Sequence, residues 1–174
     1  MRTQSENATS AGNQQERLPE ISPDYIVGLV DGEGYFSISP RKRIFGNRQA
    51  AEIDCVFGIE LKEIDKPILE RIRQKFGCGK LVFRLDKRDK FCNLWAYRVR
   101  THQELLDKII PFFNQNPLQI PSKKESFRKF REVLKLVEQG KHRTEEGFET
   151  IKNLVNKAES SETIRQAPLI GMKI

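Results

Sequence analysis

Apolar residues recur along this chain with two different periods, and these predict helices and strands in a regular order. A period near 3.6 predicts helices over five segments: 23–31, 66–76, 102–113, 122–139 and 144–157. A period of two predicts four strands: 35–41, 52–62, 81–85 and 92–100. The order predicts an α+β domain of the αββαββα type with extra C-terminal helices. Its helices are expected to cover one face of an antiparallel sheet.

The strand alternation also predicts which side chains face the helices. These are Phe36, Ile38, Ile53, Cys55, Phe57, Ile59, Leu61, Leu81, Phe83 and Leu85. Polar turns are expected to join the strands of each pair, at 42–48 and at 86–90. Residues 1–20 contain almost no apolar side chains, and residues 159–174 follow the last helical pattern. Both segments are expected to be tails without fixed structure, around a domain over residues 21–158.

The charge of the chain favours an anionic partner. Lys and Arg total 31 against 24 Asp and Glu, which gives a net charge of +7. The sequence contains no apolar run long enough for a signal peptide or a membrane span, so we expect an intracellular, soluble protein. The three cysteines form no CxxC pair and the two histidines lie far apart in the sequence, so a zinc site is not expected.

The sheet face away from the helices carries polar and basic residues and is expected to read a groove of nucleic acid. The outward strand positions and the two basic turns make up the predicted DNA-binding set: Ser37, Ser39, Arg41, Arg43, Asn47, Arg48, Gln49, Glu52, Asp54, Lys80, Arg84, Lys87, Arg88, Lys90, Arg98 and Arg100. In this set arginines suit guanine, amides suit adenine and carboxylates suit a cytosine amine. The turn residues suit phosphate groups, which position a protein without reading the sequence.

Residues 26–34 combine a helix face of small residues with an acid at the helix end. Gly28 and Gly32 are four residues apart and share one helical face, where the lack of side chains permits close approach of a second helix. Together with Leu29 they form the predicted dimer interface. Glu33 would then lie beside its symmetry mate, where two like charges require a cation. Carboxylate oxygens suit Mg²⁺.

The nine residues of this segment, IVGLVDGEG, resemble the LAGLIDADG signature in its GEG variant. Gly28, Leu29, Asp31 and Gly34 match the signature directly, and the predicted element order matches the family's fold over about residues 22–140. The resemblance implies an intron-encoded homing endonuclease of the single-motif, homodimeric type, in which the sheet face away from the helices forms a saddle that binds double-stranded DNA. Such an enzyme is a hydrolase that cleaves double-stranded DNA with the help of a divalent metal ion.

The resemblance also implies ligands for that metal ion and a basic group beside the reacting phosphate. Glu33 and the backbone carbonyl of Gly32 are expected to bind Mg²⁺. A lysine near the start of the late helix is expected to stabilise charge on the phosphate or to polarise the attacking water. Lys123 is the best positional match for this catalytic lysine, and Lys124 stays open as an alternative.

A third active-site position is implied at the end of the second strand, where the family usually has a polar residue. The direct match is Leu61, which has no useful chemistry. Glu60 or Lys62 is expected to substitute for it, and Glu60 is the catalytic candidate. This departure from the family pattern is a reason to consider reduced activity.

The expected length of the strands predicts the length of the DNA site. A strand of about eight residues spans ~26 Å, or ~8 bp of duplex, so two subunits are expected to read a partly palindromic site of roughly 20 bp. The alternatives with the same fold are an RNA maturase, which would bind intron RNA, and a DNA-binding protein that does not cut. Glu33 favours the enzyme, because a pure binder needs no acid close to the phosphates.

Overall fold

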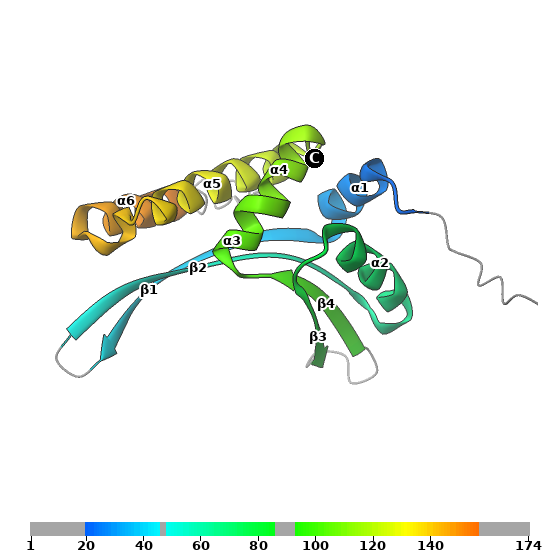
Figure 1. The fold of residues 1–174 in the computed structure, drawn as a ribbon, viewed down its shortest axis with the longest axis horizontal. Coiled ribbons are helices and arrows are strands. Elements are labelled where there is room, and N and C mark those ends of the chain that lie inside the picture. The colour runs from blue at the N-terminus through cyan, green and yellow to red at the C-terminus, as the bar shows by residue number, and fades with distance from the viewer. Residues whose placement is uncertain (1–19, 46–47, 86–92, 157–174) are drawn as a thin grey trace, which may run out of the picture.

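The computed structural model describes residues 20–45, 48–85 and 93–156 (Figure 1). The helices are α1 Pro23–Glu33, α2 Lys66–Phe76, α3 His102–Glu104, α4 Ile110–Gln115, α5 Pro121–Glu138 and α6 Glu145–Asn156. The strands are β1 Gly34–Phe45, β2 Arg48–Lys62, β3 Lys80–Leu85 and β4 Asn93–Val99. Three shorter turns of helix are η1 Glu63–Asp65, η2 Leu105–Ile109 and η3 Lys141–Arg143. Apart from Glu20, the predicted tails lie outside the described residues, as do Asn47, Lys87, Arg88 and Lys90.

The four strands form one antiparallel sheet in the order β1-β2-β4-β3. The sheet is curved, and the helices lie on its upper side in Figure 1. Its lower, concave side carries no helix of the described chain. The predicted α+β fold, with helices on one face and a saddle on the other, is therefore confirmed.

The core lies between the sheet and the helices and is built around phenylalanine rings. The Phe36 ring contacts the rings of Phe57, Phe113, Phe127 and Phe130, with centroids 5.3–5.6 Å apart. The strand residues predicted to face the helices supply the sheet side of this core. Of these, Ile53, Cys55, Phe57 and Ile59 are buried. Burial of such aromatic surface is a dominant source of stability.

The predicted helix over residues 102–113 is continuous but changes its hydrogen-bonding pattern. The middle segment η2 is a π-helix, in which the Ile110 amide donates to the Leu105 carbonyl five residues earlier. Pro111, which has no N–H, follows at the start of α4. A π turn is one way in which a helix accommodates a residue without an N–H donor. Pro111 therefore changes the local hydrogen bonding, and the helix continues into α4.

The first strand pair is longer than predicted, and the predicted basic turn at 42–48 is wrong at its ends. Lys42 and Arg43 lie in β1, and Arg48 begins β2. Exposed ion pairs lie along this extension on both sides of the sheet. Lys42 contacts Glu145 of α6 at 2.7 Å, and Arg43 pairs with Glu52 on the facing strand.

The prediction that Phe83 and Leu85 face inward into a core is also wrong. They share a sheet face with Leu81, which packs against the core, but their exposed fractions are 44% and 70%. Exposure thus rises toward the end of β3, because the helical cover does not extend that far. The Phe83 ring contacts the Trp95 ring on the neighbouring strand, with the two centroids 5.6 Å apart.

This difference between two phenylalanines makes a stability prediction. Phe57→Ala should lower the free energy of unfolding by about 3–5 kcal/mol, because it empties a fully buried site. Phe83→Ala makes the same chemical change at a half-exposed site and should cost about 1 kcal/mol or less. Urea unfolding followed by circular dichroism measures both. Equal losses would contradict the burial described above.

Candidate functional site

Helix α1 is anchored by one polar cap and one apolar stripe. The Ser22 hydroxyl accepts a hydrogen bond from the Tyr25 amide at 3.2 Å, which satisfies a free donor of the first turn. The stripe that faces the core consists of Ile26, Val27 and Val30. The opposite face is open, since a Cβ added at Gly28 or at Gly32 would meet no atom within 4 Å. The predicted interface glycines are therefore exposed in this single chain.

The junction between α1 and β1 places Glu33 at the sheet edge. The helix runs through Gly32 to Glu33, two residues beyond the end predicted at Asp31, and β1 begins at the next residue. A Cβ at Gly34 would lie 2.6 Å from the Val30 side chain, so only glycine fits here. Because no loop intervenes, the backbone of Glu33 is fixed relative to the sheet, while its side chain is exposed.

A hollow of about 390 Å³ lies next to this junction. Its lining residues are Glu33, Glu60, Leu61, Lys62, Asp65 and Leu94. Strand pairing explains the grouping, because Gly34 lies opposite Ile59, so the residues next to these two meet at the same edge. The three residues considered for the second-strand position thus all line the hollow together with Glu33.

Glu60 forms an ion pair that links the hollow to the outermost strand. Its carboxylate accepts from the guanidinium of Arg84 on β3 at 2.6 Å. The Glu60 side chain is 26% exposed and that of Arg84 is 49% exposed. The pair is therefore accessible to a ligand from the concave side and is worth little as a source of stability.

The structure distinguishes the two candidate lysines. The Lys123 ammonium, from the first turn of α5, donates to the carbonyl of Gly34, the residue that follows Glu33. Lys124 is exposed. These contacts favour Lys123 as the lysine of the site.

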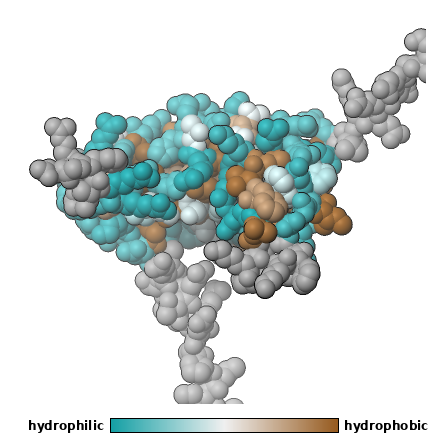
Figure 2. All heavy atoms as spheres, turned by 90° about the horizontal axis from the view of Figure 1, so that it is seen from below, coloured by the Kyte–Doolittle hydropathy of each residue, from teal (hydrophilic) through white to brown (hydrophobic). Residues whose placement is uncertain are grey.

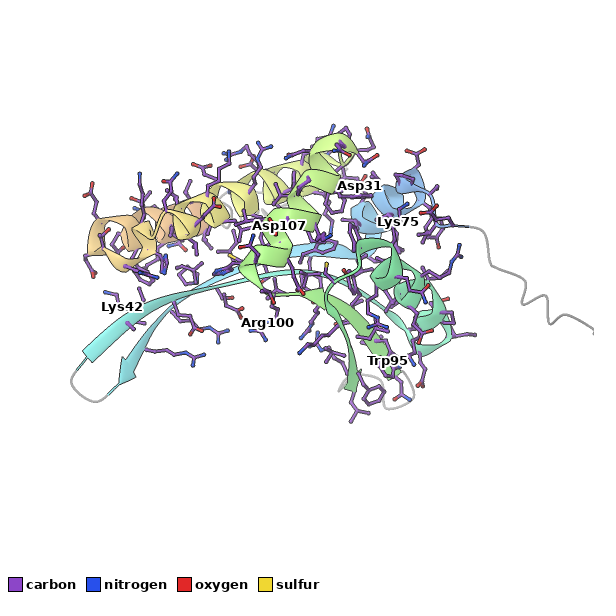
Figure 3. All side chains as sticks on the ribbon, in the orientation of Figure 1. Asp31, Lys42, Lys75, Trp95, Arg100 and Asp107 are labelled. Carbon is purple, nitrogen blue, oxygen red and sulfur yellow. The ribbon has the colours of Figure 1, made fainter. Side chains whose placement is uncertain are left out.

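Sequence analysis identified Asp31 only as a match to the signature and assigned it no function. It is buried, and its carboxylate accepts from the backbone amides of Gln119 at 2.8 Å and Ile120 at 3.3 Å. Figure 3 shows Asp31 between α1 and the helices that lie beside it. The available signal was an acid within an otherwise apolar helix stripe, which needs a hydrogen-bonding partner when buried.

Most of the predicted DNA-binding residues that lie in described strands share the concave face of the sheet. Register places Ser37, Ser39, Arg41, Arg43, Glu52, Asp54, Lys80, Arg84 and Arg98 on the side opposite Phe36 and Phe57. Arg100, which follows β4, lies below the sheet in Figure 3. Arg48 and Gln49 begin β2. Figure 2 shows this face as mostly hydrophilic, with an apolar cluster beside β3 and β4.

Arginines on this face are paired with carboxylates. Arg100 forms two hydrogen bonds with Asp54, at 3.3 Å and 2.5 Å. Arg43 pairs with Glu52 through its Nε, and Arg84 pairs with Glu60 through a terminal nitrogen. The two bonds of Arg100 hold one edge of its guanidinium and leave its remaining donors free.

Tyr35 is a further residue that sequence reasoning missed. Its ring lies over Gly58, where an added Cβ would come within 2.4 Å of the ring. Its hydroxyl accepts from the Arg98 Nε at 3.0 Å. Tyr35, Gly58, Arg98 and Lys80 are register partners in one row across the sheet, so this contact fixes an arginine beside the hollow.

The donor set at the helix end fits a divalent cation in part. The last carbonyls of a helix lack intrahelical donors and carry partial negative charge, and α1 has no basic residue in its last turn. Gly32 and Glu33 supply such oxygens there. Within residues 20–45, 48–85 and 93–156, however, no three His, Cys, Asp or Glu side chains are grouped closely enough to hold a metal ion. One protomer therefore offers an incomplete ligand set.

None of the helices in the described part of the chain is long and apolar enough to cross a membrane.

Fold and site together define an αββαββα domain in which a carboxylate-bearing helix end lies beside a sheet face rich in arginine. The model of the LAGLIDADG endonuclease family matches residues 26–134, and the chain belongs to this family. The resemblance of the signature segment is thereby confirmed.

Two curated relatives are fungal. The chain is 33% identical over 106 residues to a probable intron-encoded DNA endonuclease 1 of Mycosarcoma maydis, a match that covers 59% of this chain and 34% of that protein. It is 30% identical over 135 residues to a probable intron-encoded endonuclease 2 of Neurospora crassa, covering 75% of this chain and 28% of that protein. The chain thus spans about a third of the length of these relatives.

Solved structures share the fold. The homing endonuclease I-TnaI superposes with a TM-score of 0.66 at 31% identity, and the match covers 78% of this chain and 86% of that one. The I-LtrWI LAGLIDADG homing endonuclease, bound to target DNA, superposes with a TM-score of 0.71 at 26% identity. That match covers 81% of this chain but 45% of I-LtrWI.

The contact between Tyr35 and Gly58 predicts the effect of one added methyl group. Gly58→Ala should displace the end of the partly exposed Tyr35 ring and break its bond with Arg98, at a cost of about 1 kcal/mol of stability. Tyr35→Phe, the matched control, keeps the ring and removes only the hydroxyl that accepts from Arg98, so it should cost about 1 kcal/mol. Thermal unfolding of both variants tests this. A Gly58→Ala protein as stable as the wild type would mean that the ring does not lie over Gly58.

Proposed function

We propose that this protein is a site-specific DNA endonuclease that hydrolyses phosphodiester bonds in double-stranded DNA as a homodimer, with a divalent metal ion at each active site. The observation that carries the proposal is the meeting of Glu33 and Glu60 in one hollow beside the arginine-rich concave face. The charge of Glu60 is balanced by Arg84, whereas the exposed Glu33 carboxylate would repel a phosphate unless a cation lies beside it. The family membership and the DNA-bound state of I-LtrWI support the same substrate.

Glu33 and the Gly32 carbonyl would hold the cation, for which we propose Mg²⁺ because the ligands are oxygen atoms. When bound, the metal ion supplies a more acidic water molecule and neutralises charge on the phosphate. The described residues of one chain offer too few grouped acids, so phosphate oxygens and the second subunit are proposed to complete the coordination. Glu60 lies in the same hollow and is proposed to orient a water molecule there.

The remaining residues of the chain are proposed to position the substrate. Lys123 holds its ammonium group at the Gly34 carbonyl, next to Glu33, where a positive charge stabilises the negative charge that develops on the phosphate. Arg84 is proposed to read a base and keeps one edge on Glu60 while it does so. Arg98, held by Tyr35, is proposed to act in the same way.

The concave face is proposed to lie in the major groove. β2 has 15 residues and spans ~50 Å at 3.3 Å per residue, which is longer than the strand assumed from the sequence. Each half-site would therefore reach at least the ~8 bp expected from the sequence, which supports a partly palindromic target of roughly 20 bp. The part of the two basic hairpins that extends past these base pairs would contact phosphate groups.

The second subunit is proposed to pack on the open face of α1. Tyr25, Gly28 and Gly32 are three and four residues apart, so they lie on one side of the helix, and all three are exposed. Leu29 borders them. The chain also matches less than half of the DNA-bound I-LtrWI, so two copies of the fold would be needed to fill a structure of that size.

The metal role of Glu33 predicts a separation of binding from cleavage. Glu33→Gln should lower the cleavage rate at least about 100-fold with Mg²⁺ present, because it removes a ligand charge, while DNA affinity stays within about threefold. The substrate is a DNA pool from which the wild-type chain has selected cleaved sites. Single-turnover cleavage and gel-shift titration measure the two effects.

Glu138→Gln is the matched control, since it makes the same change at an exposed position of α5. It should cleave like the wild type. Undiminished cutting by Glu33→Gln would remove the metal role of Glu33. A wild-type chain that leaves every DNA intact but binds intron RNA would overturn the nuclease proposal in favour of a maturase.

The interface proposal predicts that bulk on the α1 face prevents dimer formation. Gly28→Leu should yield monomers or insoluble protein, because the side chain holds the two helices apart, whereas the wild type should sediment as a dimer. Gln74→Leu adds the same side chain to an exposed position on α2 and should stay dimeric. Sedimentation velocity at several concentrations measures all three. A wild-type monomer on DNA would contradict the two-fold arrangement.

A further inference from the structure

We propose that Asp31 is the positioning residue for Lys123, through the backbone that leads into α5. The proposal rests on the function proposed above for the active-site hollow, and it adds a residue that neither the signature nor the hollow assigns. Two sets of contacts carry it. One joins α1 to the residues just before α5, and the other joins the first turn of α5 to the start of β1.

The first contact set anchors the segment before α5. The Asp31 carboxylate accepts from the consecutive amides of Gln119 and Ile120, with one oxygen for each amide, at 2.8 Å and 3.3 Å. Asp31 is 7% exposed, so its charge depends on these donors for stabilisation. A buried carboxylate with two backbone donors forms short, directional bonds, which fix the position of both residues.

The second contact lies one turn further along. α5 begins at Pro121, directly after Ile120, so the orientation of its first turn depends on where the anchored amides are held. From that turn Lys123 reaches back to the Gly34 carbonyl at the end of the signature segment. The chain thus closes a ring from Asp31 through the amides to Lys123 and back to Gly34.

The ring explains why the two acids of the signature segment have different surroundings. Glu33 is exposed and faces the hollow, whereas Asp31 is buried and faces the segment before α5. Asp31 touches neither the hollow nor the concave face in these contacts. Its effect on catalysis would therefore act only through the place at which Lys123 holds its charge.

Chemical labelling of the full chain tests the positioning directly, without any cleavage assay. A limiting amount of acetic anhydride acetylates lysines in proportion to their accessibility and freedom, and mass spectrometry reports the extent at each position. Lys123 is half-buried and bonded, whereas its neighbour Lys124 is exposed. In the wild type Lys123 should be acetylated about tenfold more slowly than Lys124. The reason is that the charged Lys123 ammonium is held by its hydrogen bond to the Gly34 carbonyl.

Asp31→Asn should bring the two lysines to within about twofold of each other, because the amide side chain offers one acceptor where two are needed. Asp24→Asn, the matched control in the exposed first turn of α1, should leave the wild-type ratio unchanged. Asp31→Glu keeps the charge but moves its oxygens, and it should shift the ratio in the same direction if Asp31→Asn does not fold. An unchanged ratio in a folded Asp31 variant would overturn the proposal.

A double-mutant cycle on single-turnover cleavage then tests the route of the effect. Asp31→Asn should slow cleavage about tenfold in the wild type but less than about twofold in a Lys123→Ala background, because residues that act as a unit are not additive. Equal slowing in both backgrounds would show a general structural role and overturn the positioning role. If the wild type cleaves no DNA, the nuclease proposal fails, while the labelling result still decides whether Asp31 positions Lys123.

Discussion

The direct passage from helix to strand at Gly34 is the constraint on which the rest of the site depends. With no loop between α1 and β1, burial of the helix stripe sets the position of Glu33 relative to the sheet. The same junction contains the Gly34 carbonyl, which accepts a hydrogen bond from Lys123. It also aligns the end of β2 with the helix end, which creates the hollow. Any side chain at Gly34 would collide with Val30 and disturb all of these relations together.

The concave face carries arginines that would attract DNA phosphates and carboxylates that pair with several of these arginines. A face of arginines alone would bind any duplex through its phosphates, and such binding carries no sequence information. Here Glu52, Asp54 and Glu60 each hold an arginine and add negative charge beside it. The carboxylates lower the gain from random phosphate contacts, while the fixed forks retain donors for base edges. Acidic residues on the proposed DNA-binding face are therefore consistent with specific recognition.

The charges of the site also explain why a single chain looks incomplete. Glu33 is exposed at a helix end with negative partial charge, next to a helix face that carries no side chains at Gly28 and Gly32. An exposed acid and an exposed glycine face are each unremarkable in isolation. Their adjacency favours a partner helix that brings its own acid and a cation that both share. The proposed dimer and the proposed metal ion thus address the same electrostatic problem.

The order of the elements, the signature and the identity of the two sheet faces could be predicted from the sequence, because each depends on the local spacing of apolar residues. The contact of Lys123 with the Gly34 carbonyl, the pairing of Arg84 with Glu60, the partners of Asp31 and the exposure of Phe83 could not. These depend on contacts between segments far apart in the chain, or on where a helical cover ends. Local periodicity places a residue on a face but carries no information about what lies opposite it, so only packing of the helices onto the curved sheet decided them.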